Sequence, residues 1–317
     1  MRLGDTVAAR VAERESQIVL GLDPDPSTLW PGAGLQGNGR PNARRSATGD
    51  SGALEPAVAA VLEHCLAVID ATADACVAVK LQLARFEVLG GAGWSAMRIV
   101  AAHARGLGLL VIADGKRGDI DVSARAYASA LLGGVDTPFG KLDGLGADLV
   151  TVNPLMGRDA IEPFVHAARA LGAGVLALVR TSNPGAADIE DLELRGGGTV
   201  WERVAKIVNE LGAGGVGEAG LSDVGAVIGA TQPAHLARAR ELMGSAIFLL
   251  PGVGVQGGRV EDLAPAFLPG RAGGLVAASR AIADAHRESG GKPAVAARAQ
   301  AERLREAAWA LSERALR

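Results

Sequence analysis

The stretch GLLVIADGKRGDI, residues 108–120, joins two parts that rarely belong together. Its first half, GLLVIA, is apolar without interruption, as in a strand that is buried on both faces. Its second half brings four charged residues to the end of that strand: Asp114, Lys116, Arg117 and Asp119. A solvated turn is the common reason for charges at such a place, and a ligand site is the alternative. The rest of the chain decides between them.

Similar apolar runs recur along the chain, and Ala-rich amphipathic segments separate most of them. The predicted strands are 17–22, 76–81, 108–113, 148–153, 174–179, 224–230, 246–250 and 273–279. The predicted helices are about 55–73, 94–106, 121–132, 158–171, 199–211, 232–243 and 293–315. Strands that alternate with helices pair in parallel. Eight of them favour a closed (β/α)8 TIM barrel over an open sheet, built as a single α/β domain of residues 1–317.

The segment 30–54 interrupts this alternation. It is rich in Gly, Asn, Arg and Ser and has no apolar periodicity, which predicts a flexible loop inserted after the first strand. Its three arginines could contact a ligand or a partner, but a solvated loop is the more common outcome.

The composition excludes several classes of protein. The net charge of −3 provides no broad basic face for nucleic acid. No run of about 20 uninterrupted apolar residues predicts a membrane span, and the first residues lack the apolar core of a signal peptide. Cys65 and Cys76 lack CxxC spacing and the five histidines form no HxH or HxxxH pair, so we expect no metal site. Without a signal peptide, a membrane span or a cysteine pattern typical of disulfides, we expect a cytoplasmic protein.

In a TIM barrel the ligand site lies where the carboxyl ends of the strands open into loops. The polar residues at the predicted strand ends are Asp23, Lys80, Gln82, Asp114, Lys116, Asp119, Asn153, Thr181, Ser182, Asn183, Thr231, Ser279 and Arg280, together with the loop PGVGVQGGR at 251–259. A lone Asp23 or Asn153 is more often a turn residue or a helix cap. Polar residues at all eight strand ends indicate a lined pocket.

The last two strand ends predict a phosphate site. The Gly-rich loop at 251–259 would expose backbone N–H groups, and a helix N-terminus after Arg280 would add partial positive charge. The Arg280 guanidinium can bind phosphate through two N–H groups. Many TIM barrels bind phosphate at this place.

The charged stretch has a simple geometric interpretation. In extended backbone the side chains of Asp114 and Lys116 point to the same side. Lys116 would then face the barrel mouth between two carboxylates, with Lys80 coming from the preceding strand. Opposite charges keep each other ionised, so the group requires no metal. Arg117 would point away and have a structural role.

These motifs resemble those of the orotidine 5′-phosphate decarboxylase family, in particular its longer subfamily. DGKRGDI matches the DxKxxDI run of that family. The other matching motifs are VKLQLARFE (79–87), TVNPLMG (151–157), RTSNPGA (180–186), LPGVGVQGG (250–258) and SRAI (279–282). The resemblance spans most of the chain. It implies a cofactor-independent carboxy-lyase that converts orotidine 5′-phosphate to UMP and CO2 in pyrimidine biosynthesis.

The resemblance also implies roles for single residues. The catalytic set would be Lys80, Asp114, Lys116 and Asp119. Lys116 would protonate C6 of the substrate, and Asp119 would enter the site of the neighbouring subunit of a homodimer. Asp23 and Lys80 would bind the ribose, Ser182 the pyrimidine edge, and Gln256 and Arg280 the phosphate. The rest of the implied substrate-binding set is Ser123, Asn153, Thr181, Gly257 and Ser279.

The chain departs from the family pattern at three places. Ser123 stands where the family usually has Thr, which keeps the hydroxyl but is less rigid. Leu81 and Arg85 stand where the subfamily tends to have Pro and Phe, so we expect different packing around Lys80.

Two other functions fit a phosphate-binding barrel. A class I aldolase would form a Schiff base on a strand lysine that has lost its proton. A lysine between two aspartates holds its proton more tightly, which argues against this reaction for Lys116. A sensor or scaffold that only binds phosphate would not require the charged array.

Overall fold

The computed structural model describes residues 1–33, 53–254 and 257–317, and a closed barrel of eight parallel strands forms its centre. The barrel strands are β1 (Ile18–Leu22), β2 (Ala78–Gln82), β3 (Leu110–Arg117), β6 (Leu149–Val152), β7 (Gly174–Arg180), β8 (Val224–Ile228), β9 (Phe248–Pro251) and β10 (Gly274–Ala278). Neighbours in the chain are neighbours in the barrel, and β10 closes the barrel by pairing with β1. The predicted TIM barrel is confirmed.

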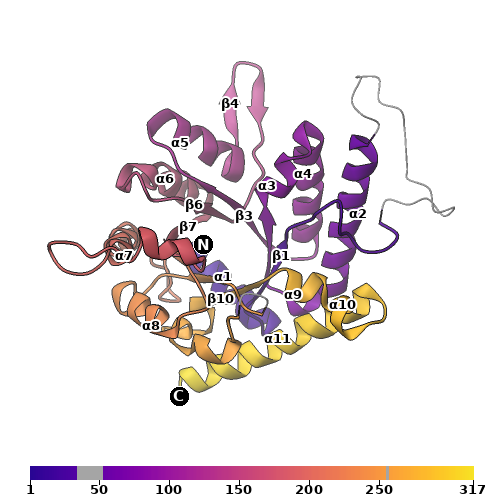
Figure 1. Cartoon of the computed structure of the whole chain (residues 1–317). Helices are drawn as coiled ribbons and strands as arrows, with labels where there is room; N and C mark the ends of the chain where they lie inside the picture. Colours follow the sequence, from indigo (N-terminus) through magenta and orange to yellow (C-terminus); the bar gives the residue numbers. More distant parts are fainter. Residues whose placement is uncertain (34–52, 255–256) are drawn as a thin grey trace.

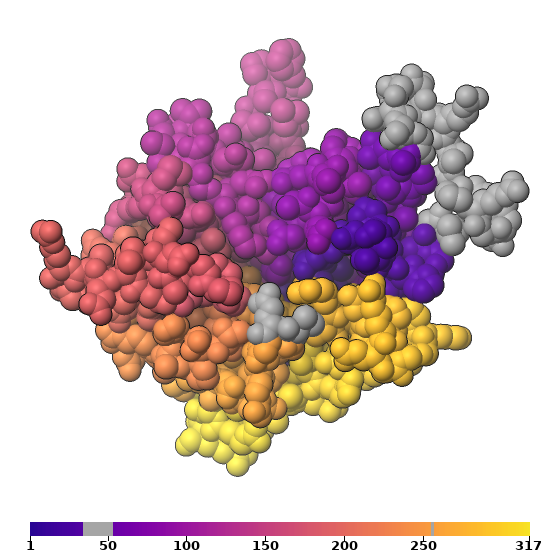
Figure 2. Space-filling view, in the orientation of Figure 1, coloured from indigo at the N-terminus to yellow at the C-terminus, as the bar shows by residue number. Residues whose placement is uncertain are grey.

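An outer ring of helices covers the barrel (Figure 1). Its main helices are α2 (Leu54–Thr72), α4 (Gly90–Gly106), α5 (Asp121–Ala128), α6 (Glu162–Leu171), α7 (Val200–Gly212), α8 (Pro233–Leu242) and α11 (Pro293–Ala315). The shorter helices α3 (Leu83–Glu87), α9 (Arg280–Ala283) and α10 (Ala285–Ser289) follow β2 and β10. The last helix, α11, packs against α2, so the two ends of the ring meet, and Figure 2 shows the last part of the chain beside the first.

One helix closes the amino end of the barrel, where the strands begin. Helix α1 (Leu3–Arg14) places Leu3, Val7 and Val11 in the same apolar cluster as the inward-facing strand residues Leu176 and Leu249. A second and larger cluster fills the space between the strands and the outer helices. Because both faces of the strands are buried, the strands read as continuous apolar runs in the sequence. The opposite, carboxyl end of the barrel carries a cavity, described below.

Three features differ from the prediction. Strand β3 continues beyond residue 113 through the charged stretch to Arg117. The predicted helix 121–132 is helical to Ala128 and then widens into a π-turn at Ser129–Gly133. After this turn a hairpin of β4 (Val135–Thr137) and β5 (Gly140–Leu142) projects from the molecule, visible behind α4 and α5 in Figure 1.

Helix α2 bears on the expected absence of a membrane span. Among the described residues, Leu54–Ala75 is the one segment long and apolar enough to cross a membrane by length and composition. In the fold this helix packs against α4 and α11, and Val61, Cys65 and Val68 are fully buried. Its apolar residues therefore serve the outer layer of the barrel. Most of the predicted 30–54 loop lies outside the described residues.

Candidate active site

Asp114 lies at the centre of a charged group at the open end of the barrel. It comes from β3, and its Oδ2 accepts from Lys80 Nζ of β2 at 2.7 Å. Its Oδ1 accepts from Lys116 Nζ at 2.6 Å and from the Thr151 hydroxyl of β6 at 2.8 Å. Asp23, after β1, lies 3.8 Å from Lys80 Nζ. The structure thus brings together the predicted Lys80–Asp114–Lys116 array and fixes it from three strands.

The charges of this array support one another in a place that water hardly reaches. Asp114 is 4% exposed and Lys80 is 6% exposed. Burial alone would raise the pKa of Asp114, but the ammonium groups of Lys80 and Lys116 lower it to about 2. Burial alone would lower the pKa of Lys80, but the carboxylates of Asp114 and Asp23 raise it. Both groups therefore stay ionised at neutral pH.

The backbone places Lys116 in an unusual conformation. Its φ is +48°, and the pairing of β3 with β6 shifts between Ala113 and Arg117, as in a β-bulge. The Thr151 hydroxyl accepts the Lys116 backbone N–H at 2.9 Å and donates its own proton to Asp114. The simple picture of an extended strand is therefore wrong at Lys116, although its side chain still reaches Asp114. The side chain of Lys116 is 41% exposed and faces the open cavity.

Arg117 has the structural role predicted for it. Its guanidinium pairs with Glu87 of α3 and lies over the ring of Tyr127 in α5. It does not line the cavity at the barrel mouth.

A cavity of about 470 Å³ opens above this array. The predicted site residues that line it are Asp23, Lys80, Asp114, Lys116, Thr181, Ser182, Ser279 and Arg280. Gln82, Asn183 and Glu190 also line it, although they were outside the predicted site set. The strand-end rule gave Gln82 and Asn183 as polar positions, whereas Glu190 lies ten residues beyond the end of β7 and carried no such signal. Thr151 bonds to both Asp114 and Lys116. It lies within an otherwise apolar strand, so the strand-end rule did not indicate it.

Other predicted residues lie away from the cavity of their own chain. Asp119 accepts the backbone N–H of Ile120 at 2.8 Å, and Ser123 is exposed in the first turn of α5. Asn153 accepts the backbone N–H of Leu155 at 3.0 Å, as a turn residue does. Gly257 donates its backbone N–H to Gly254 within the loop after β9. Gln256 lies outside the described residues.

Where the sequence predicts a phosphate site, the helix after Ser279 is shorter than expected. Helix α9 after Ser279 has only four residues, so few aligned peptide dipoles add charge there. The cation available is the Arg280 side chain, which makes no ion pair with the residues that the structure describes. Gly21 of β1 leaves room for Ser279, because a Cβ at Gly21 would lie 1.8 Å from the Ser279 hydroxyl.

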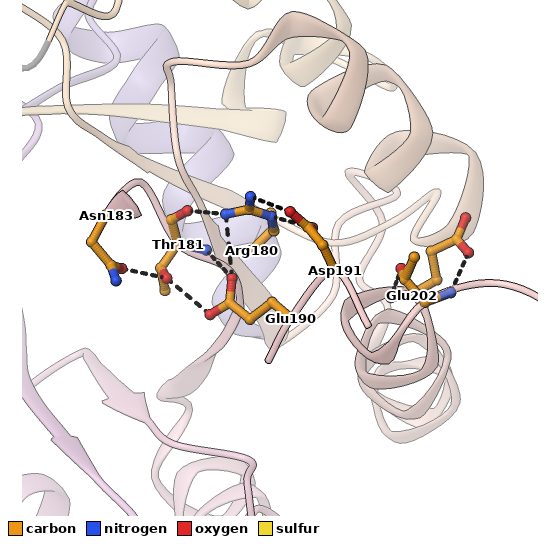
Figure 3. A network of polar contacts seen from close by, with 7 residues as sticks. Arg180, Thr181, Asn183, Glu190, Asp191 and Glu202 are labelled. Carbon is orange, nitrogen blue, oxygen red and sulfur yellow. Dashed lines mark hydrogen bonds and ion pairs between the residues drawn. The ribbon is translucent and has the colours of Figure 1, made fainter. Parts of the chain in front are cut away.

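The end of β7 carries a second polar network, shown in Figure 3. Arg180 is held by Asp191 through two hydrogen bonds of 2.9 and 2.8 Å, from Nε and Nη2. Glu190 accepts the backbone N–H of Thr181 at 2.8 Å and lies 2.9 Å from its hydroxyl. The network holds in place the segment with Thr181, Ser182 and Asn183, three residues that line the cavity.

A second cavity of about 540 Å³ lies next to the first. Asp23, Gln82, Ser279 and Arg280 line both cavities and form the wall between them. The far side of the second cavity includes Arg85, which pairs with Asp25 at 3.2 Å, as well as His64 and Arg287. Among the described residues, no group of three or more His, Cys, Asp or Glu side chains is arranged to hold a metal ion.

Comparison with known proteins gives one consistent family. The model of the Orotidine 5'-phosphate decarboxylase / HUMPS family matches residues 16–298. The chain is 45% identical over 226 residues to the orotidine 5′-phosphate decarboxylase of Deinococcus radiodurans, covering 71% of this chain and 78% of that protein. It is 42% identical over 232 residues to that of Rhodopirellula baltica, covering 72% and 74%.

A solved structure agrees over nearly the whole length. The structure of Leishmania donovani OMP decarboxylase matches with a TM-score of 0.70 and 27% identity, covering 99% of this chain and 100% of that chain. The family match, the relatives and the barrel all point the same way. The chain belongs to the orotidine 5′-phosphate decarboxylase / HUMPS family.

Proposed function

We propose that this chain is a cofactor-independent decarboxylase that converts orotidine 5′-phosphate to UMP and CO2 in pyrimidine biosynthesis. The observation that supports it most is the buried Asp114 carboxylate between the ammonium groups of Lys80 and Lys116. The array lines a cavity large enough for a nucleotide, in a chain of the matching family.

Lys116 is the proton donor in this proposal. When the bond between C6 and the carboxylate breaks, CO2 leaves and the electron pair stays on C6. The Lys116 ammonium attracts this developing anion and then transfers a proton from Nζ to C6. Because the Lys116 side chain is 41% exposed, the resulting amine can regain its proton from water.

Asp114 acts on the ground state. The substrate carboxylate would lie near an aspartate whose pKa is lowered to about 2 by two ammonium groups, so the two negative charges repel each other. Loss of CO2 relieves that repulsion. Lys80 and Thr151 hold Asp114 in place.

The remaining lining residues divide between the parts of the nucleotide. Asp23 and Lys80 bind the ribose hydroxyls, Ser182 the pyrimidine edge, and Arg280 with Ser279 the phosphate. Their positions around one cavity support this division. Binding energy from the phosphate, remote from C6, is then available to exclude water from the reacting carbon.

We further propose a homodimer that shares its active sites. Asp119 and Ser123 do not line the cavity of their own chain, and the exposed apolar side chains Ile120 and Val122 lie beside them in the sequence. An exposed apolar surface next to unused site residues favours a partner subunit there.

The cytoplasm is the proposed location, and the two cysteines, both free and buried, suit a reducing compartment.

The test is the loss of orotidine 5′-phosphate absorbance with purified protein, with and without EDTA. We expect the same rate of UMP formation in both. An EDTA-sensitive rate would contradict the metal-independent mechanism. No conversion at all, with UMP still bound, would assign the barrel to a different reaction. Borohydride treatment with substrate should trap no adduct, since the aldolase alternative requires a Schiff base.

A further inference from the structure

The segment after β1, residues 23–30, ties two parts of the outer layer together. The Trp30 backbone N–H at its end donates to His64 Nδ1 of α2 at 3.1 Å. The Trp30 indole Nε1 donates to the Ala283 carbonyl of α9 at 2.7 Å. The segment, in indigo in Figure 1, is therefore bonded to α2 on one side and to the end of α9 on the other.

The Trp30 ring is fixed from several sides. It is 7% exposed and belongs to the large apolar cluster between the strands and the outer helices. The imidazoles of His64 and His286 meet it edge to face, with ring centroids 5.5 and 6.5 Å away. Because the ring has little room to turn, its Nε1 is a fixed point to which the Ala283 carbonyl is bonded.

Helix α9 depends on such contacts for its orientation. It has only four residues, from Arg280 to Ala283, and a helix of one turn is not stable by itself. The buried side chain of Ile282 holds one face of the turn. The Ala283 carbonyl belongs to the group that a helix leaves without a partner inside the helix at its C-terminus, and Trp30 bonds to it. Trp30 therefore holds the end of the turn that begins with Arg280.

Arg280 has little support of its own. It lines the active cavity and makes no ion pair with the residues that the structure describes. Its position at the cavity therefore follows from the position of the α9 backbone. A misplacement of about 1 Å in a positioning group can lower an enzymatic rate about 100-fold, so the contact at Ala283 has consequences at the phosphate.

We infer that Trp30 is a positioning residue for phosphate binding, because its bond to Ala283 holds α9 so that Arg280 meets the phosphate of the nucleotide. The inference rests on the proposed phosphate role of Arg280. Trp30 itself lines neither the active cavity nor the second one. Since it acts through Arg280, its effect on binding should disappear when the Arg280 side chain is removed.

A double-mutant cycle on UMP binding, which requires no turnover, tests this order of action. Trp30→Phe keeps an aromatic ring but loses the N–H donor, and we expect UMP to bind about 5- to 10-fold more weakly. Arg280→Ala should weaken UMP binding on the order of 10- to 100-fold, as for a hydrogen bond between charged groups. In the Arg280→Ala background, Trp30→Phe should weaken it further by no more than about 2-fold. Calorimetric titration measures the four dissociation constants.

Two further variants separate this role from a general loss of order. Trp94→Phe in α4 changes another partly buried Trp that packs against the same apolar cluster, and should leave UMP binding native. Arg287→Met serves if Trp30→Phe does not fold. It removes the bond of 2.9 Å from α10 to the Thr28 carbonyl of the same segment, at an exposed position. Its weakening of UMP binding should likewise disappear in the Arg280→Ala background.

Equal weakening of UMP binding by Trp30→Phe in both backgrounds would overturn the inference, since Trp30 would then act through Asp23 or through the order of the whole fold. Native UMP binding by Trp30→Phe would overturn it too. The proposed function is judged separately. Native UMP binding by Arg280→Ala contradicts the phosphate role of Arg280, whereas independent effects of the two substitutions contradict the inference alone.

Discussion

Asp114 is the residue on which the stability of the site depends most. It accepts from Lys80, Lys116 and Thr151, and without its charge the two ammonium groups would face each other. Removing one partner of a buried ion pair typically costs about 3–5 kcal/mol. We expect Asp114→Asn to lower the free energy of unfolding by about that amount in urea titrations. Lys80→Met in the same chain should recover part of the loss, and a single variant as stable as the native chain would contradict this role.

Asp114 also predicts that the free energy of unfolding falls at acid pH. The pKa of Asp114 is lowered from 3.8 to about 2 in the fold, so the folded state releases this proton more readily than the unfolded state. Its contribution, about 2 kcal/mol, is present above pH 4 and is lost as the pH falls toward 2. Asp114→Asn should lack this part of the native pH profile.

Lys116 provides the sharpest test of chemistry at the residue scale. If its ammonium stabilises and protonates C6, Lys116→Ala should lower kcat by at least about 10⁴-fold. The binding of UMP should stay close to native, because the cavity is formed mainly by other side chains. Stopped assays at high enzyme concentration and calorimetric titration with UMP measure the two effects. Native turnover by this variant would exclude Lys116 as the donor.

At the scale of elements, burial made the barrel predictable from the sequence. All eight barrel strands overlap the predicted ranges, because β1, β8 and β10 are buried along their whole length and read as apolar runs. The β4–β5 hairpin was missed because its short strands are largely exposed and carry no such pattern. The predicted strand 108–113 stops before the observed end of β3, because the last residues of β3 are polar and yet pair with β6 after the bulge.

The site was predictable only where its residues follow strand ends. Lys80 and Asp114 were found by that rule. Glu190 comes from the connection between β7 and α7 and reaches the cavity through tertiary contacts. The positive φ of Lys116 depends on Thr151 of another strand, which no local pattern reports.

The link between α2 and the segment after β1 depends on pH. His64 of α2 accepts the backbone N–H of Trp30 through Nδ1 at 3.1 Å, so that nitrogen must be unprotonated. Burial lowers the pKa of His64 from 6.5 to about 4. Between these values the unfolded chain binds a proton that the folded chain does not. The native chain should therefore lose up to about 3 kcal/mol of stability as the pH falls from 6.5 to 4.

His64→Gln keeps an acceptor for Trp30 without a titrating ring. Urea titrations across this pH range should show a flatter profile for this variant than for the native chain. His166→Gln, at an exposed position of α6, should leave the native profile unchanged. A His64→Gln profile as steep as the native one would show that other groups cause the dependence.

At the scale of the whole molecule, the proposed homodimer with shared sites predicts complementation between two inactive variants. Lys116→Ala and Asp119→Asn homodimers should each be inactive. After mixing and subunit exchange, each mixed dimer has one site with both a native Lys116 and a native Asp119 from the partner subunit. A random mixture should regain about a quarter of native activity. If Asp119 served its own chain, mixing would restore nothing.

The wall of Asp23, Gln82, Ser279 and Arg280 has a consequence for inhibitor chemistry. An inhibitor confined to the active cavity has only the contacts that the substrate also uses. A polar arm that passes this wall would enter the second cavity and meet the guanidinium groups of Arg85 and Arg287. Fragment linking across the wall would therefore give an inhibitor ionic contacts beyond those in the active cavity, and so a higher affinity.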